Sequence, residues 1–164
     1  MKTKYKLLHF LPAVCIMTGI FYFSSQTAVQ SSGLSSNITE ELIKGISHFF
    51  NIQEDTAIGT AFFHIIEILV RKSAHMAEYG VLAVTIAYPL SKLKIQGIRL
   101  ILWSELISVL YAATDEFHQL FVPGRSGQLT DVFIDGAGAL IGCLLFYLIN
   151  NIVARKKNTK KNRR

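Results

Sequence analysis

Four long apolar runs limit what this chain can fold into. They cover 7–23, 74–90, 98–114 and 132–150, and each contains few charged residues. A helix needs about 20 largely apolar residues to cross the hydrocarbon core of a bilayer. Charged residues make up only 17% of the chain, whereas a soluble domain carries about a quarter. The sequence therefore predicts an all-α membrane protein with four transmembrane helices at these positions.

The first run could instead be a secretory signal peptide, because three lysines precede it. It lacks a good A-x-A cleavage site, so a retained membrane anchor is the preferred interpretation. The 164 residues then form a single membrane domain, 1–150, followed by a basic tail, 151–164.

The segment between the first two runs has a different character. Residues 24–37 are rich in serine, which favours turns. Apolar residues at helical spacing follow around Leu42, and the apolar stretch 57–70 is interrupted by His64 and Glu67. We expect one or two short amphipathic helices here, on the membrane surface or packed over the spans. A re-entrant segment at 57–70 is the alternative.

Positive charge is distributed asymmetrically around the apolar runs. Lysines precede the first run, Lys92, Lys94 and Arg99 surround the turn between the second and third, and seven basic residues without an acid close the chain. Four spans would place all three clusters on one side, and such clusters mark the cytoplasmic face. The sequence predicts that both termini are cytoplasmic. Because the basic clusters directly flank apolar runs, the net charge of +6 indicates contact with the lipid bilayer and not a nucleic-acid partner.

Ionisable residues concentrate toward the opposite ends of the runs. His75 and Glu78 share a helical face of the second run, and Asp131 and Asp135 share a face of the fourth with Gly138. Small residues at such spacing mark close contact between membrane helices. A carboxylate facing lipid is costly, so we expect these faces to meet in one polar pocket in the outer third of the bilayer.

Some of these residues also have ordinary structural explanations. Asp131 follows Thr130 at a predicted helix start, where the helix dipole favours an acid. Arg71 and Lys72 could extend from a membrane helix to the interface. The segment VPGR, 122–125, predicts a type II turn.

Three sequence blocks carry a family resemblance. FSSQ ends the first run, RKSAHMAEYGVL opens the second, and DEFHQLFVPGRSGQLTDVFIDGAGALIG leads from the third into the fourth. Together they resemble the VanZ-like family of bacterial membrane proteins. The resemblance implies a multi-pass protein of the cell envelope, located in the bacterial plasma membrane. The founding member of that family is associated with resistance to teicoplanin, a glycopeptide that binds cell-wall precursors.

The chain carries the residues of the family pattern. They are Ser25, Gln26, Lys72, His75, Tyr79, Asp115, Glu116, His118, Gln119, Pro123, Arg125, Asp131 and Gly138. Some family members have asparagine where this chain has Asp135, so its charge is not a fixed family feature.

Three functions from different classes are open. The first is an enzyme acting on a lipid-linked or cell-wall-related substrate, with an arginine or lysine holding a phosphate or carboxylate and a histidine acting as acid or base. A divalent metal that activates water is an alternative mechanism. The second is a non-catalytic binding or accessory protein that sequesters an envelope precursor or a glycopeptide. The third, a transporter, is less favoured because four spans are few.

The candidate residues fall into two groups. The candidate catalytic residues are His75, Glu78, Asp115, Glu116, His118 and Asp135. All of these except Glu116 are also the candidate metal ligands. The candidate substrate-binding residues are Ser25, Gln26, Lys72, Gln119, Arg125 and Asp131.

Overall fold

The computed structural model describes residues 8–50 and 57–162, and every regular element in these ranges is helical. The elements are η1 (Leu8–Phe10), α2 (Leu11–Ser24), α3 (Ala28–Phe50), α4 (Ala57–Lys92), α5 (Ile98–Gln119) and α6 (Leu129–Asn162). The predicted all-α class is therefore confirmed.

The segment between the first two predicted spans differs from the expectation. A single helix of 23 residues, α3, begins at Ala28, so the turn prediction for 24–37 is wrong over most of its length. Serine disfavours a helix only weakly, and the absence of proline from 28–50 lets the helix continue.

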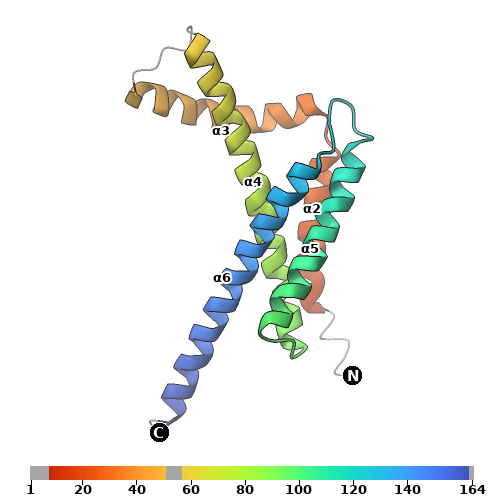
Figure 1. The fold of residues 1–164 in the computed structure, drawn as a ribbon, viewed down its shortest axis with the longest axis vertical. Helices are drawn as coiled ribbons and strands as arrows, with labels where there is room; N and C mark the ends of the chain where they lie inside the picture. The colour runs from red at the N-terminus through yellow and green to blue at the C-terminus, as the bar shows by residue number, and fades with distance from the viewer. Residues whose placement is uncertain (1–7, 51–56, 163–164) are drawn as a thin grey trace.

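The stretch 57–70 is neither a separate surface helix nor a re-entrant segment, because it forms the first part of α4. With 36 residues, α4 is about 54 Å long at 1.5 Å per residue. This length exceeds the roughly 30 Å of a bilayer core. The last turns of α3 and the first turns of α4 extend away from the other helices (Figure 1).

Two helices extend further toward the predicted pocket than the apolar runs suggested. Because α5 continues to Gln119, Asp115 and Glu116 lie on a helix and not in a loop. The side-chain amide of Gln119 donates hydrogen bonds to both carboxylates, at 3.2 Å and 3.3 Å, which supports the last helical turn. At its other side the loop ends at Leu129, so Asp131 lies in the first turn of α6, where an acid is favourable.

The most extensive helix contact is the crossing of α4 and α6 (Figure 1). A Cβ atom on Gly142 would overlap the backbone carbonyl of Gly80, and one on Gly138 would overlap the carbonyl of Met76. The two backbones therefore touch without intervening side chains, as small residues permit in membrane helix pairs. The close contact expected from the small residues of the fourth run is confirmed.

The other helices pack around this crossing. Tyr79 and Leu82 of α4, Leu100 of α5 and Ala139 of α6 are buried in a common core, which Ile20 of α2 joins. The Tyr111 hydroxyl of α5 donates a hydrogen bond of 2.6 Å to the carbonyl of Met17, so α5 and α2 are also joined by a polar contact.

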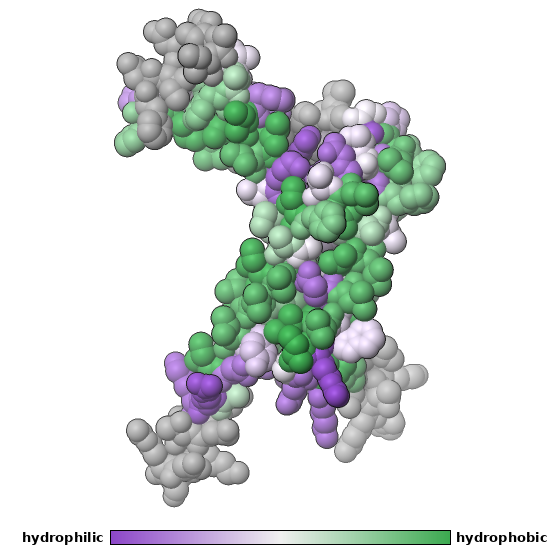
Figure 2. All heavy atoms as spheres, viewed as in Figure 1, coloured by the Kyte–Doolittle hydropathy of each residue, from purple (hydrophilic) through white to green (hydrophobic). Residues whose placement is uncertain are grey.

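Among the described helices, one segment, Leu129–Lys156, is both long and apolar enough to cross a membrane. The helical stretch Leu8–Ser24 is apolar but shorter. Figure 2 shows hydrophobic side chains over the middle of the visible face, with hydrophilic side chains gathered toward its two ends. The full set of four spans stays a prediction.

The helix ends form two groups, one at each end of the bundle. The start of α2, the α4–α5 turn and the end of α6 lie at one end of the bundle, and the α5–α6 loop lies at the other (Figure 1). Two of the three basic clusters used to predict orientation therefore share an end. The lysines that precede the first run, and Arg163 and Arg164, lie outside the described residues.

The glycine contact leads to a stability prediction. We expect Gly142→Ala to lower the free energy of unfolding by about 1–3 kcal/mol, because the added methyl group forces the α4 and α6 backbones apart. Gly19→Ala on α2 is the matched control, since no atom lies within 4 Å of its added Cβ. Thermal unfolding in detergent measures both variants. Equal stability of the two alanine variants would contradict the close crossing.

Candidate functional site

The α5–α6 loop turns sharply at Pro123 and Gly124. Gly124 has a φ of +75°, and the Arg125 N–H donates to the Val122 carbonyl at 3.1 Å. This geometry is that of a type II turn, in which the third residue needs a positive φ, so the predicted turn is confirmed. The turn directs the Arg125 side chain back toward the helices.

Arg125 joins the loop to the end of α2. Its Nε donates to the Gln26 carbonyl at 3.2 Å and its Nη2 to the Phe23 carbonyl at 3.4 Å. A guanidinium has five N–H donors, so three of them stay available for a ligand. The two backbone contacts fix the position of the guanidinium group.

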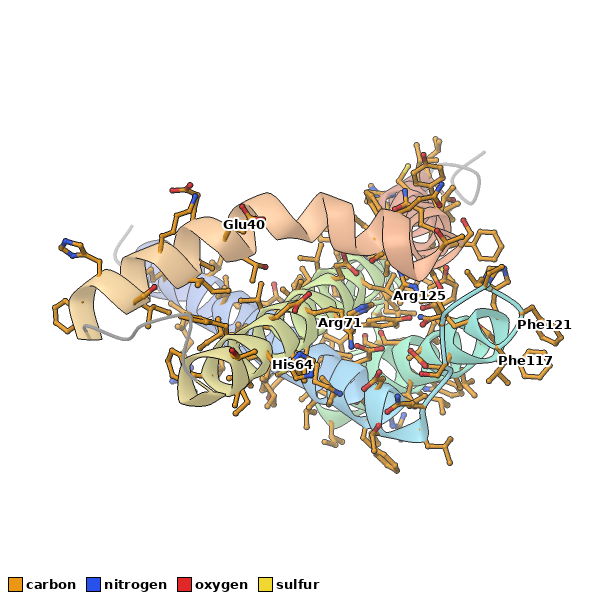
Figure 3. All side chains as sticks on the ribbon, turned by 90° about the horizontal axis from the view of Figure 1, so that it is seen from above. Glu40, His64, Arg71, Phe117, Phe121 and Arg125 are labelled. Carbon is orange, nitrogen blue, oxygen red and sulfur yellow. The ribbon has the colours of Figure 1, made fainter. Side chains whose placement is uncertain are left out.

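Two adjoining cavities lie at this end of the bundle. The smaller has a volume of about 110 Å³ and a largely polar lining from α3, α4, α5, α6 and the loop. The larger, of about 490 Å³, has apolar walls formed by residues of α2 and α4. The two cavities share Ser31, Arg71, His75 and Arg125. Figure 3, seen from above, shows Arg71 and Arg125 close together near the centre of the molecule.

The basic side of the site contains two arginines without an acidic partner. No ion pair within the described residues includes Arg71 or Arg125. Burial, and after it the like charge of Arg71, lower the pKa of Arg125. Lys72 differs, because its Nζ lies 2.5 Å from Asp131 Oδ1, and this ion pair joins α4 to α6.

Three buried carboxyl groups form the acidic side. Asp115, Glu116 and Asp135 are 3%, 7% and 1% exposed. Glu116 accepts hydrogen bonds from the side chain of Gln119 and, at 2.8 Å, from the Gln128 N–H. One oxygen each of Asp115 and Asp135 has no hydrogen-bond partner among the described residues. These acids are therefore buried with incomplete compensation, which is unusual away from functional sites.

His75 and Glu78 lie one turn apart on α4 and both line the larger cavity. His75 Nδ1 and Glu78 Oε2 are 4.0 Å apart. His75 also lines the smaller cavity beside Arg71 and Arg125. It is therefore the histidine of the candidate set that lies next to both arginines.

The structure brings most of the candidate residues to these cavities. Those that line one or both are Gln26, Lys72, His75, Glu78, Asp115, Glu116, Gln119, Arg125, Asp131 and Asp135.

Two of the candidates lie elsewhere. The ring of His118 packs against Phe21, with centroids 4.5 Å apart, and lines neither cavity. The Ser25 hydroxyl donates to the Tyr22 carbonyl at 2.7 Å and likewise lines neither cavity.

Sequence reasoning missed Arg71 and Ser24 as members of the site. The candidate set omits Arg71, for which extension to the interface was an alternative explanation, although it lies one helical turn before His75 and lines both cavities. Ser24, and not its neighbour Ser25, lines the larger cavity and is buried with an unpartnered hydroxyl. The helical spacing of Arg71 and His75 was the available signal for the first. No pattern distinguishes the two adjacent serines.

The candidate metal ligands do not form a metal centre. In the ranges 8–50 and 57–162, no three His, Cys, Asp or Glu side chains are gathered closely enough to hold a metal ion. The ring of His118 packs against Phe21 and lines neither cavity, whereas His75 lines both. The arrangement fits the binding of an anion by arginines better than it fits metal coordination.

The acidic side predicts a pH dependence of stability. Burial raises the pKa of Glu116 above its ordinary 4.5, as do Asp131 and Asp115, while the Gln128 hydrogen bond and Arg125 oppose the rise. The folded protein then keeps a proton that the unfolded chain has released. We therefore expect the free energy of unfolding to fall as the pH rises from 4.5 toward the folded pKa and to level off above it.

Thermal unfolding between about pH 4 and pH 8 tests this expectation. Glu116→Gln should make the decline less steep, because one titrating group is removed. Glu40→Gln, at an exposed position on α3, is the control and should leave the profile as it is in the parent chain. An unchanged slope in Glu116→Gln would show that this carboxyl titrates normally.

The sequence was also compared with known proteins. The sequence model of one protein family, VanZ/LLP1, matches residues 9–150, which cover α2 to α5, most of α6 and the whole candidate site. No curated protein matches the chain, and no solved structure does so. A match over so much of the length agrees with the motifs at 71–82 and 115–142. The chain belongs to the VanZ/LLP1 family.

Proposed function

We propose that this chain is a multi-pass protein of the bacterial plasma membrane whose two cavities open on the outer side. In this arrangement both termini are cytoplasmic, and the α5–α6 loop is external. The cavities bind the anionic group of a lipid-linked or cell-wall-related substrate. Membership of the family and the large exposed apolar side chains of α2, α5 and α6 support the membrane location.

Two arginines support the proposed binding of an anion. Arg71 on α4 and Arg125 in the loop line both cavities and have no ion pair to a described acid. Two guanidinium groups held close together repel one another, and an anion between them converts this repulsion into attraction. Arginine also binds phosphate and carboxylate through paired hydrogen bonds.

His75 gives the site a group for acid–base chemistry. It lies beside both arginines and is followed after one turn by Glu78, whose carboxylate can orient the imidazole. We place the transfer of a proton to or from the bound substrate at His75. The chain would then be an enzyme acting on the group that the arginines hold.

A non-catalytic binding or accessory protein is the second candidate, and the fixed position of Arg125 favours it. Two backbone carbonyls of the α2 end hold this side chain in place, so the site is arranged before a ligand arrives. Such a protein would sequester an envelope precursor or a glycopeptide. The family resemblance extends this second proposal to teicoplanin resistance.

Substitution of the arginines tests the binding site. We expect Arg125→Ala and Arg71→Ala each to weaken the binding of a polyprenyl phosphate by at least about tenfold, since each removes a charged donor pair. Arg125→Lys should recover only part of the affinity, because lysine cannot form the paired contact.

The matched control is Arg99→Ala, an exposed position at the opposite end of α5. Affinity is measured by titration of the purified full chain in detergent. Equal losses for Arg99 and Arg125 variants would point to a general charge effect and would refute the site.

Substitution of His75 separates the enzyme from the binding protein. If the chain is an enzyme, His75→Ala lowers turnover of the lipid phosphate by at least about a hundredfold and leaves its affinity largely intact. His48→Ala, exposed on α3, should keep full turnover. Release of product is followed by mass spectrometry. Binding without turnover in the parent chain would favour the second candidate.

A further inference from the structure

The smaller cavity is lined by charges of both signs. Arg71 and Arg125 line it from α4 and the α5–α6 loop, and Glu116 and Asp135 line it from α5 and α6. The two acids have no cationic partner within 4 Å among the described side chains. Arg125 forms no ion pair with either acid: two of its five N–H groups donate to carbonyls at the end of α2, and the other three stay available to a ligand.

The acidic side contains more acceptors than the protein satisfies. Oδ1 of Asp115 and Oδ1 of Asp135 are buried and accept no hydrogen bond from a described residue. A single amide group, that of Gln119, serves both Asp115 and Glu116. A buried carboxylate needs a cation or further donors, so this side of the cavity is suited to a ligand that brings them.

A buried hydroxyl on α4 also lacks a partner. The Tyr79 side chain is completely buried, and its hydroxyl has no hydrogen-bond partner in the described part of the chain. Its ring lies 6.3 Å from that of Tyr111 on α5, centroid to centroid, and it lines neither cavity. Tyr79 therefore belongs to the buried surroundings of the site and does not contact the cavity.

The larger cavity supplies an apolar surface next to these charges. Ile20, Phe23, Val70 and Ala74 contribute to its walls, and Arg71 and Arg125 lie at its junction with the smaller cavity. A ligand with its anionic group between the arginines could therefore extend an apolar chain into the larger cavity.

We propose that the site recognises a zwitterionic amphiphile, in which a phosphate and a primary ammonium group lie a few bonds apart next to an apolar chain. Arg71 and Arg125 bind the phosphate. The ammonium donates its N–H groups to Glu116 and Asp135 in the smaller cavity and to Asp115, which lines the adjoining larger cavity. The apolar chain lies along the α2 and α4 walls of the larger cavity. This inference rests on the anion site of the proposed function and names the chemical class of its ligand.

The same head group could come from a membrane lipid or from a soluble amino phosphate. The test therefore compares four probes on the purified full chain in detergent: short-chain phosphatidylethanolamine, phosphatidylcholine and phosphatidylglycerol with the same acyl chains, and free phosphoethanolamine. We expect phosphatidylethanolamine to bind about tenfold more tightly than phosphatidylglycerol, which lacks the ammonium. Phosphatidylcholine should also bind weakly, because its quaternary nitrogen has no N–H donor.

Substitutions of the buried acids test whether these residues cause the preference for the ethanolamine lipid. Asp135→Asn should remove the preference for the ethanolamine lipid and leave affinity for phosphatidylglycerol unchanged or higher. Glu40→Gln, exposed on α3, should keep the preference. Asp115→Asn serves as a second variant with the same expected result should Asp135→Asn fail to fold.

The binding results distinguish the zwitterion inference from the anion site of the proposed function. Free phosphoethanolamine binding as tightly as the lipid would support the head-group recognition and assign it to a soluble ligand. Equal affinity of the parent chain for the ethanolamine and glycerol lipids would overturn the zwitterion inference and leave the anion site standing. Binding of none of the probes, and of no polyprenyl phosphate, would overturn the proposed function and this inference together.

Discussion

The direct backbone contact between α4 and α6 determines the rest of the structure. Glycines replace side chains where the two helices cross, so Gly80 meets Gly142 and Gly138 meets Met76. Because the helices diverge from this contact, the turns just beyond it on the loop side are held at a defined separation. Lys72 and His75 of α4 and Asp131 and Asp135 of α6 occupy those turns, so the crossing sets the width of the site.

One pair of opposite charges in the site forms an ion pair, and the two arginines and three buried acids have no ion-pair partner among the described residues. The ion pair of Lys72 and Asp131 joins α4 to α6. Arg71 and Arg125 on one side, and the buried acids on the other, keep charges that the described protein does not neutralise at close range. Such an arrangement is costly in a folded chain, and a ligand with complementary charges removes that cost. This explains why ionisable residues gather in a chain that is otherwise so apolar.

The sequence was most informative where one physical rule acts alone. The start of α5 and the Pro123–Gly124 turn were predicted correctly, since apolar length and the positive φ of a glycine determine them. The extent of α3 and the extension of α5 to Gln119 were missed, because weak local preferences are overridden by helix continuity and by side-chain hydrogen bonds within the last turn. Helical spacing predicted that His75, Glu78 and Asp135 would reach the site. Spacing did not predict that His118 turns to Phe21, because this depends on packing against a helix nearly a hundred residues earlier.

Lys72 of α4 and Asp131 of α6 are in direct contact across 59 residues of sequence, and the arrangement of the site depends on this contact. A double-mutant cycle on Lys72→Ala and Asp131→Ala, read as the free energy of unfolding in lipid bicelles, tests that contact most directly. We expect a coupling energy of about 1 kcal/mol or more, as is typical of a partly buried ion pair. Effects that add to within about 0.3 kcal/mol would mean that the two side chains do not meet, and the arrangement of the site described above would be wrong.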